Sequence, residues 1–564
     1  SFKMMSMDII KSVEHSSKIL RDNPQHITDR IFFIDASNQS LTTIPPEILE
    51  LKELEEVHLE NNDIAVIPQD IQHLKNIRIL YLNKNKLRNL CPELGKLARL
   101  KGLDLSNNPL LFSSIPVISH IRTLRELRLY KIYLREFPIV ICKSLHHLEL
   151  LGLSGNLLKS LPQEIVNQTK LREIYLKQNK FEVFPQELCV LYNLEIIDLD
   201  ENKLNSIPEE IGNLTMLQKF YVAYNKVPFI PDSLYHCSKL SVLDFSHNLL
   251  YCIPHTLTEL TEMTEIGLSG NQLEKVPRLI CKWTSLQLLY LRNTGLRSLR
   301  RSFRRLVNLR FLDLSQNHLE HCPLQVCALK NLEILALDDN KIRQLPPEIG
   351  SLSKLKILGL TGNQFFSFPE EIFSLASLER LYLGQDQGVK FTTVPECISK
   401  LQRLKELHIE NNHLEYLPES LGLLPNLEIL DCCHNLLRQL PDAICKAQAL
   451  KELLLEDNLL THLPENLDSL VNISALTLME NPMVEPPVEV CTEGIEAIWR
   501  YLKGNRNMKI MATKIQAWWR GIMVRKGLGR FEELQKPRKK GKASPKDKKG
   551  KKAEKGKPPK GNKK

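Results

Sequence analysis

A short leucine pattern recurs with a period of mostly 23 residues along this 564-residue chain. Residues 171–185 read LREIYLKQNKFEVFP, and residues 194–208 read LEIIDLDENKLNSIP. Both follow L-x-x-L-x-L-x-x-N-x-L-x-x-L-P, with Ile or Phe at some leucine positions. A fixed period of this length predicts a stack of similar units, because each unit can bury its apolar face only against its neighbours.

The asparagine column of this pattern sets the number of units. Four units carry Gln39, Ile132, Thr294 or Asp386 there and sixteen carry Asn, so we count twenty. An amide both donates and accepts hydrogen bonds, so we expect the asparagines to satisfy backbone groups of neighbouring units and to form a ladder. They are Asn62, Asn85, Asn108, Asn156, Asn179, Asn202, Asn225, Asn248, Asn271, Asn317, Asn340, Asn363, Asn412, Asn435, Asn458 and Asn481.

The other columns of the pattern predict the fold. The central L-x-L should be a short strand with its leucines in the core, because side chains alternate along a strand. Leu-Pro should close the turn, since proline fixes φ where no donor is needed. The rest of each unit should return along the outer face, partly as helix. The pattern resembles the leucine-rich repeat. That resemblance implies an α/β repeat, a solenoid with a curved parallel sheet on its concave face.

The segments outside the repeats have their own character. A solenoid needs caps, and we expect a cap helix in residues 1–30 before the repeats of residues 31–487. Residues 488–506 should form a closing helix, and residues 507–535 a second, basic helix. Residues 536–564 hold 15 Lys or Arg against two acids and almost no apolar residues, which predicts a disordered tail.

Two units depart from the pattern. Unit 16 carries a three-residue insertion within residues 384–395. Unit 12 has Thr294 and Arg300 in place of Asn and Pro, followed by Arg301, Arg304 and Arg305. These features are either a tolerated bulge and a solvated basic patch, or a local binding feature on the rim.

The charge, the apolar runs and the cysteines limit the classes of function that this chain can have. The net charge is +10 and the tail carries +13, so residues 1–535 are near neutral and predict no nucleic-acid groove. The positive charge of the tail would allow it to contact nucleic acid or another anionic surface.

No apolar run reaches the roughly 18 residues that cross a bilayer, and no signal-peptide core is present, so we expect a cytoplasmic protein. Six cysteines share one column and should be reduced, buried hydrophobes: Cys142, Cys189, Cys281, Cys327, Cys445 and Cys491. No nucleophile–base set, phosphate loop or zinc spacing occurs, so we expect no enzyme, cofactor, metal or small-molecule substrate.

The residue between the two strand leucines should face out of the concave sheet. Tyr175, Asp198, Tyr221 and Asp244 alternate there in four consecutive units. Exposed Tyr is enriched at protein interfaces, so this stretch is a candidate site for a protein partner. The alternative is that Tyr is present only because it has good β propensity.

Residues 515–528 read IQAWWRGIMVRKGL and match apolar-Gln-x-x-x-Arg-Gly-x-x-x-Arg-x-x-apolar at every defined position. On a helix, Ile515, Trp519 and Ile522 would share one face with basic residues around it. A basic amphipathic helix fits an acidic, apolar groove. The alternatives are a helix that packs on the solenoid end and nonspecific adhesion to a membrane.

This pattern resembles the IQ motif, and the resemblance implies binding of calmodulin or a calmodulin-like protein. By that resemblance, Ile515 and Trp519 anchor in one lobe of the partner, and Gln516 bonds to the backbone of that lobe. Gly521 allows close approach, and Arg520 and Arg525 pair with acids of the partner. The implied set is Ile515, Gln516, Trp519, Arg520, Gly521, Ile522, Arg525 and Leu528.

The repeats, a GIEAIWRYLK-like closing helix, one IQ motif and a lysine-rich tail together resemble the leucine-rich repeat and IQ domain-containing proteins. The repeats alone also resemble the Ras-associated group of intracellular leucine-rich-repeat scaffolds. The first resemblance implies a scaffold that binds calmodulin and a further protein. The second implies a Ras- or phosphatase-type regulatory adaptor without calmodulin input. A place at the cytoskeleton or in a cilium follows by analogy only.

Overall fold

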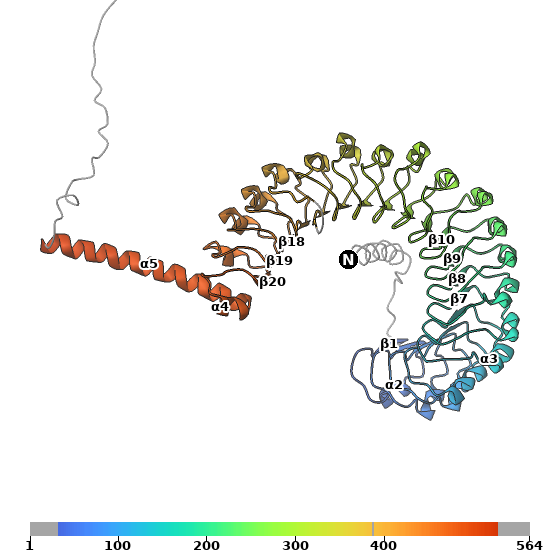
Figure 1. Ribbon diagram of the computed structural model, residues 1–564. Coiled ribbons are helices and arrows are strands. Elements are labelled where there is room, and N and C mark those ends of the chain that lie inside the picture. The colour runs from blue at the N-terminus through green and yellow to red at the C-terminus, as the bar shows by residue number, and fades with distance from the viewer. Residues whose placement is uncertain (1–31, 386–388, 528–564) are drawn as a thin grey trace, which may run out of the picture. The chain divides into compact units, whose positions relative to one another are not determined.

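The computed structural model describes residues 32–385 and 389–527. Within this part of the chain, twenty three-residue strands form one parallel sheet, and each strand pairs with the next one in sequence. The sheet lines the inner side of the arc of repeats, and short helical segments form its outer side (Figure 1). The predicted solenoid and its twenty units are confirmed.

The strands are β1 (Phe33–Asp35), β2 (Glu56–His58), β3 (Ile79–Tyr81), β4 (Gly102–Asp104), β5 (Glu126–Arg128), β6 (Leu150–Gly152), β7 (Glu173–Tyr175), β8 (Ile196–Asp198), β9 (Lys219–Tyr221), β10 (Val242–Asp244), β11 (Glu265–Gly267), β12 (Leu288–Tyr290), β13 (Phe311–Asp313), β14 (Ile334–Ala336), β15 (Ile357–Gly359), β16 (Arg380–Tyr382), β17 (Glu406–His408), β18 (Ile429–Asp431), β19 (Glu452–Leu454) and β20 (Ala475–Thr477).

The outer segments are α2 (Pro46–Leu49), α3 (Ile139–Ser144) and the 3₁₀ helices η1 (Gln69–His73), η2 (Pro92–Lys96), η3 (Phe112–His120), η4 (Gln163–Asn167), η5 (Gln186–Val190), η6 (Glu209–Asn213), η7 (Asp232–His236), η8 (His255–Glu259), η9 (Arg278–Lys282), η10 (Arg301–Arg305), η11 (Leu324–Ala328), η12 (Pro347–Ser351), η13 (Glu370–Ser374), η14 (Glu396–Lys400), η15 (Glu419–Leu423), η16 (Asp442–Lys446) and η17 (Leu467–Ser469).

Proline begins most of these outer turns. Pro208 precedes η6 with φ −73°, and its carbonyl accepts the amide of Ile211 at 3.1 Å. Proline suits this place because its fixed φ matches the turn and no donor is required. The return path is partly helical, as predicted, and mostly 3₁₀.

The asparagine ladder is confirmed, because all sixteen ladder asparagines are buried. Asn225 is representative. Its Nδ2 donates to Leu199 O at 2.9 Å in the preceding repeat and to Val222 O at 3.0 Å in its own. Its Oδ1 accepts Leu204 N at 3.0 Å. Each amide therefore joins two adjacent repeats by backbone hydrogen bonds.

Left-handed backbone precedes the ladder residue. The residue just before the asparagine has positive φ, as at Lys84 (58°), Glu201 (56°) and Tyr224 (57°). Glycine takes this place at Gly155 and Gly270. Most side chains disfavour this conformation, so the surrounding hydrogen bonds must hold it.

Both irregular units fit into the sheet. Arg380 pairs with Glu406, 26 residues on, so the insertion of unit 16 leaves the strands in register; Asp386 itself lies outside the described residues. In unit 12, Thr294 is buried, and its Oγ1 donates to Leu291 O at 2.9 Å, which replaces the bond of the ladder amide within its own repeat.

After β20 come α4 (Val488–Thr492) and α5 (Ile495–Lys526). Ala497 and Ile498 near the start of α5 are buried. The predicted boundary between two helical segments at residue 506 is wrong, because α5 continues through that residue. The expected cap in residues 1–30 and the tail lie outside the described residues. No helix in the described part of the chain could span a membrane.

All thirteen cysteines are free thiols. Of the six that share one column, Cys142, Cys189, Cys281 and Cys327 are buried, while Cys445 and Cys491 are half-buried. Burial raises the pKa of Cys142 and of Cys189 to about 12, so these thiols are protonated and unreactive at neutral pH.

Candidate partner-binding surfaces

The IQ-like segment lies in the second half of α5. Residues 497–526 contain no proline, and Gly504 and Gly521 are the only glycines among them, so little interrupts the helix. The last turn carries Arg525 and Lys526, which complement the negative end of the helix dipole. Leu528, the final predicted contact, lies outside the described residues.

The side chains that would anchor a partner are accessible on α5. Ile515 is 59% exposed and Trp519 is 54% exposed. Gln516 and Arg520 are exposed as well, and Ile522 is half-buried. Ile515, Trp519 and Ile522 lie along one helical face because their spacing is i, i+4, i+7. The helix therefore presents an apolar face flanked by bases.

Gly521 has no role within the helix itself. A Cβ at this position would meet only Arg525 Nη2, at 3.7 Å. Arg525 Nε donates to the Gly521 carbonyl at 3.1 Å, a bond that any residue at position 521 could accept. Glycine inside a helix costs about 1 kcal/mol relative to alanine. A close approach by another molecule would account for that cost.

On the concave face, the four predicted partner-binding residues lie side by side. In the paired strands β7 to β10, Tyr175 is opposite Asp198, Asp198 is opposite Tyr221, and Tyr221 is opposite Asp244. All four are half-buried. The Tyr175 hydroxyl donates to Glu173 Oε1 at 2.7 Å. The tyrosine rings remain partly accessible between strands.

The aspartates of this column have a local structural task that the sequence analysis missed. Each of the six accepts the backbone N–H two residues further on, at 3.0 or 3.1 Å. Short polar side chains stabilise chain reversals in this way, so one carboxylate oxygen is already committed where the strand ends. The six are Asp35, Asp104, Asp198, Asp244, Asp313 and Asp431.

Burial also weakens the negative charge of this stretch. It raises the pKa of both Asp198 and Asp200, which are neighbours. Asp200 Oδ1 accepts the amide of Ala223 at 2.6 Å. A protonated carboxyl here can donate a hydrogen bond but cannot attract a cation. The tyrosines, rather than the aspartates, are the stronger candidates for partner contact.

A second concave surface was missed by the sequence analysis. The first strand position, polar in many repeats, is apolar in four consecutive strands: Leu288, Phe311, Ile334 and Ile357 are aligned in register. Tyr290 contacts Phe311 with ring centroids 4.8 Å apart. We call these five residues the apolar stripe. Four of them, Leu288, Phe311, Ile334 and Ile357, line a hollow of about 490 Å³.

Ion pairs line the edge of the apolar stripe. Glu333 lies between Arg310 (2.6 Å) and Lys356 (3.4 Å), and Lys405 pairs with Glu379 at 3.1 Å. Opposite charges alternate along this edge from one repeat to the next. A partner would therefore meet an apolar floor and a nearly balanced charged edge.

Strand β17 carries a charged histidine, His408. Burial lowers the pKa of His408, but Asp431 and Glu406 outweigh burial and raise the pKa to about 9. His408, Glu410 and Asp431 have potential ligand atoms within 4.8 Å of one another. A histidine protonated at neutral pH is a poor metal ligand, so we describe the cluster as an ion-pair network.

The basic residues of unit 12 divide between two places. Arg301, Arg304 and Arg305 are exposed on η10 of the outer face. Arg300, in the proline position, donates from Nε to Val276 O at 2.7 Å and thereby joins two repeats.

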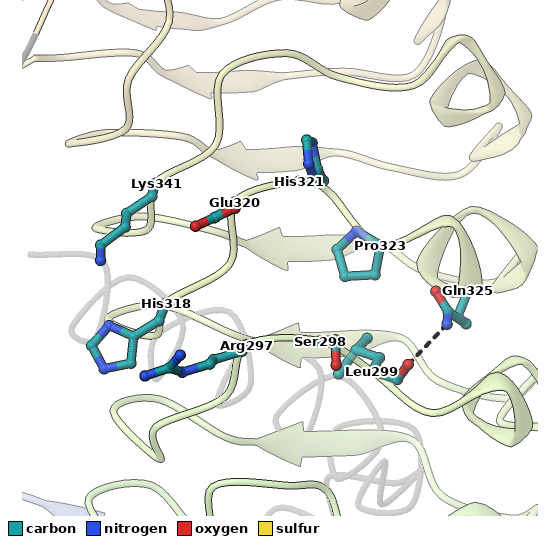
Figure 2. Close-up of a pocket in the computed structure, with 9 residues that line it drawn as sticks. All are labelled: Arg297, Ser298, Leu299, His318, Glu320, His321, Pro323, Gln325 and Lys341. Atoms are coloured by element: carbon teal, nitrogen blue, oxygen red, sulfur yellow. Dashed lines mark hydrogen bonds between the residues drawn. The ribbon is translucent and has the colours of Figure 1, made fainter.

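A separate hollow of about 550 Å³ lies among the turns of units 12 to 14 (Figure 2). Arg297, His318 and Lys341 lie at its far end from Gln325, which donates from Nε2 to Leu299 O at 2.9 Å (Figure 2). Its walls mix basic side chains with Glu320. No sequence signal marked this hollow, because its residues come from the variable turn positions of neighbouring repeats.

Known proteins match both the repeats and the whole chain. Residues 299–415 match the family model described as a leucine-rich repeat region, and residues 169–227 match the leucine rich repeat model. Among solved structures, an LRR protein of Leptospira interrogans is 30% identical over 70% of this chain and 94% of its own, with a TM-score of 0.54. A TDR receptor shares the fold at a TM-score of 0.52 and 24% identity, over 81% of this chain and 85% of its own.

Two curated relatives carry one name, leucine-rich repeat and IQ domain-containing protein 4. The Mus musculus protein is 77% identical over 100% of this chain and 95% of its own length. The Homo sapiens protein is 80% identical over 96% of this chain and 97% of its own. The repeats point to a role in protein–protein interaction rather than in catalysis. At this identity and coverage, the chain belongs to the family of leucine-rich repeat and IQ domain-containing protein 4.

Proposed function

We propose that this protein is a cytoplasmic scaffold that binds calmodulin or a calmodulin-like light chain through α5 and a second protein through its concave face. The observation that carries the first part is the accessible apolar face of Ile515, Trp519 and Ile522 on the continuous helix α5, in a segment whose sequence matches the IQ pattern. The relatives' names, which contain the words IQ domain, support it. Thirteen free thiols support a reducing compartment.

Apolar anchors contribute most of the affinity in this proposal. An aromatic or aliphatic side chain that fills a pocket can contribute about 2 kcal/mol or more. Exposed charge pairs such as those of Arg520 or Arg525 with acids contribute about 0–1 kcal/mol each and are screened by salt. The bases therefore act more on the association rate than on the lifetime of the complex.

Titration of the full chain with calmodulin, with calcium and with a chelator, tests the proposal. Ile515→Glu places a charge in the expected pocket and should weaken binding at least tenfold, which corresponds to about 1.4 kcal/mol. Val524→Glu is the matched control, because residue 524 lies half a turn around the helix from Ile515. The control should bind within about twofold of the parent, since twofold is only ~0.4 kcal/mol.

No binding in either condition at micromolar calmodulin, or equal binding by Ile515→Glu and the parent, would refute the proposal that α5 binds calmodulin. The protein would then be better described as a Ras- or phosphatase-type adaptor. A capture experiment with and without residues 505–564 separates these two functions, because the adaptor would keep its partners after the deletion.

The second partner is assigned to the concave face on two grounds. Tyr175 and Tyr221 leave their rings partly accessible between strands, and tyrosine is a frequent contributor to binding energy. The apolar stripe provides a floor in a hollow with charged walls. A protein segment with apolar side chains and charges of both signs fits this face.

A further inference from the structure

The accessible apolar face of α5 does not begin at the IQ pattern. Met508 is 71% exposed and Met511 is 61% exposed. They lie seven and four residues before Ile515, so a helix of 3.6 residues per turn places all three on one face. Trp518 and Ile522 continue the same face at i+3 and i+7. This face therefore spans about four turns, of which about two precede the motif.

The charge on α5 argues against a second copy of this chain as the molecule that covers this apolar face. From Ala497 to Lys526 the helix contains eight basic residues and no acid. Two such helices side by side would bring like charges together along the whole contact, including Lys514 and Arg525 beside the apolar face. Like charges at a helix interface disfavour pairing. An acidic partner meets no such repulsion.

We propose that the acidic, helix-binding partner contacts α5 from Met508 onward, so that Met508 and Met511 form an anchor pair two turns before the IQ pattern. This inference rests on the proposed function and extends its site. Methionine suits the task, because its unbranched, polarisable side chain adapts to irregular apolar grooves. From Met508 to Lys526, where α5 ends, the contact covers 19 residues, or about 28 Å of helix at 1.5 Å per residue. That length can engage both lobes of a two-lobed partner.

Ile510 offers an internal control for this pair. It lies between the two methionines in sequence and is 54% exposed, similar to Met511. Five residues before Ile515, it is rotated about 140° around the helix and points away from the shared face. A change at Ile510 therefore alters exposed apolar area on the same turns of the helix without touching the proposed contact.

The experiment uses the full chain with calmodulin as the probe, in calcium and in chelator, and measures affinity by calorimetry. The double variant Met508→Gln/Met511→Gln should bind at least tenfold more weakly, whereas Ile510→Gln should change affinity by less than twofold. Circular dichroism should report equal helicity for both variants, since all three side chains are exposed. Hydrogen exchange should give protection of amides 508–513 on binding in the parent.

The possible outcomes distinguish a failure of the anchor pair from a failure of the proposed calmodulin binding. If the methionine variant binds as tightly as the parent while Ile515→Glu does not, the anchor pair is wrong and the calmodulin assignment stands. If the parent does not bind calmodulin at all, both are wrong. Light scattering provides a further check. A dimer of the full chain that the methionine variant abolishes would assign this face to self-association and overturn the proposal.

Discussion

Asn225→Ala tests the asparagine ladder at a position where the structure specifies what is lost. The amide makes four hydrogen bonds: three from Nδ2, to Leu199 O, Val222 O and Ala223 O, and one to Oδ1 from Leu204 N. Alanine removes all four, but the consequences differ between acceptors and donor.

The three carbonyls keep a partner after the change. Leu199 O still accepts from Asn202 Nδ2 at 3.0 Å, Val222 O from Asn248 Nδ2 at 2.9 Å, and Ala223 O from the amide of Glu201 at 2.8 Å. The N–H of Leu204 instead loses the acceptor that Asn225 supplied. A buried donor without a partner costs about 1–3 kcal/mol, and this single group should dominate the effect.

The expected result is a loss of about 1–3 kcal/mol in the free energy of unfolding by urea. Hydrogen exchange at the Leu204 amide should accelerate more than at equivalent amides in distant repeats. Gln39→Ala is the control, because Gln39 occupies the same column but is exposed at the start of the array. Equal destabilisation by the two variants, or an unchanged exchange rate at Leu204, would refute the ladder argument.

Replacing Tyr175 and Tyr221 together by Ala should leave the fold intact and reduce capture of a concave-face partner; recovery of the same partners would move the site to the apolar stripe. Burial raises the pKa of Asp338 to about 7, above its ordinary 3.8, so the folded state retains a proton that the unfolded state has released. Stability should therefore fall as pH rises from about 4 to 7. Asp338→Asn should flatten that slope in pH-dependent urea unfolding, and a variant as pH-sensitive as the parent would contradict the assignment. Gly521→Ala should increase helicity measured by circular dichroism yet weaken calmodulin binding; tighter binding by this variant would mean that no partner approaches closely there.

Much of the fold was predictable because each repeat restates the same local chemistry. The L-x-L pair predicted each strand, and proline predicted the start of the outer turn, since both depend on backbone geometry within a few residues. The asparagine column predicted the ladder because an amide is able to bond two repeats at once. Twenty copies of one pattern made these predictions robust to single departures such as Thr294.

The candidate sites could be predicted only in part from the sequence, because they depend on contacts between repeats. In sequence, Leu288, Phe311, Ile334 and Ile357 are apolar residues 23 positions apart, and nothing local distinguishes them from variable strand positions. Parallel pairing in exact register brings them together as a surface. The aspartate column looked like an interface, but its local hydrogen bonds became evident only with the backbone in place.

What the sequence alone determined was the number of repeats, their strands, their ladder and the IQ pattern with its order of side chains. Only the tertiary structure decided the backbone conformations that neighbouring repeats stabilise. Glu201 and Tyr224 adopt positive φ, which their own chemistry disfavours. The amide of each donates across to the next repeat, Glu201 N to Ala223 O and Tyr224 N to Ser246 O, each at 2.8 Å. A residue's intrinsic preference can be read from its identity, but a conformation stabilised by the adjacent repeat can be read only once the repeats are stacked.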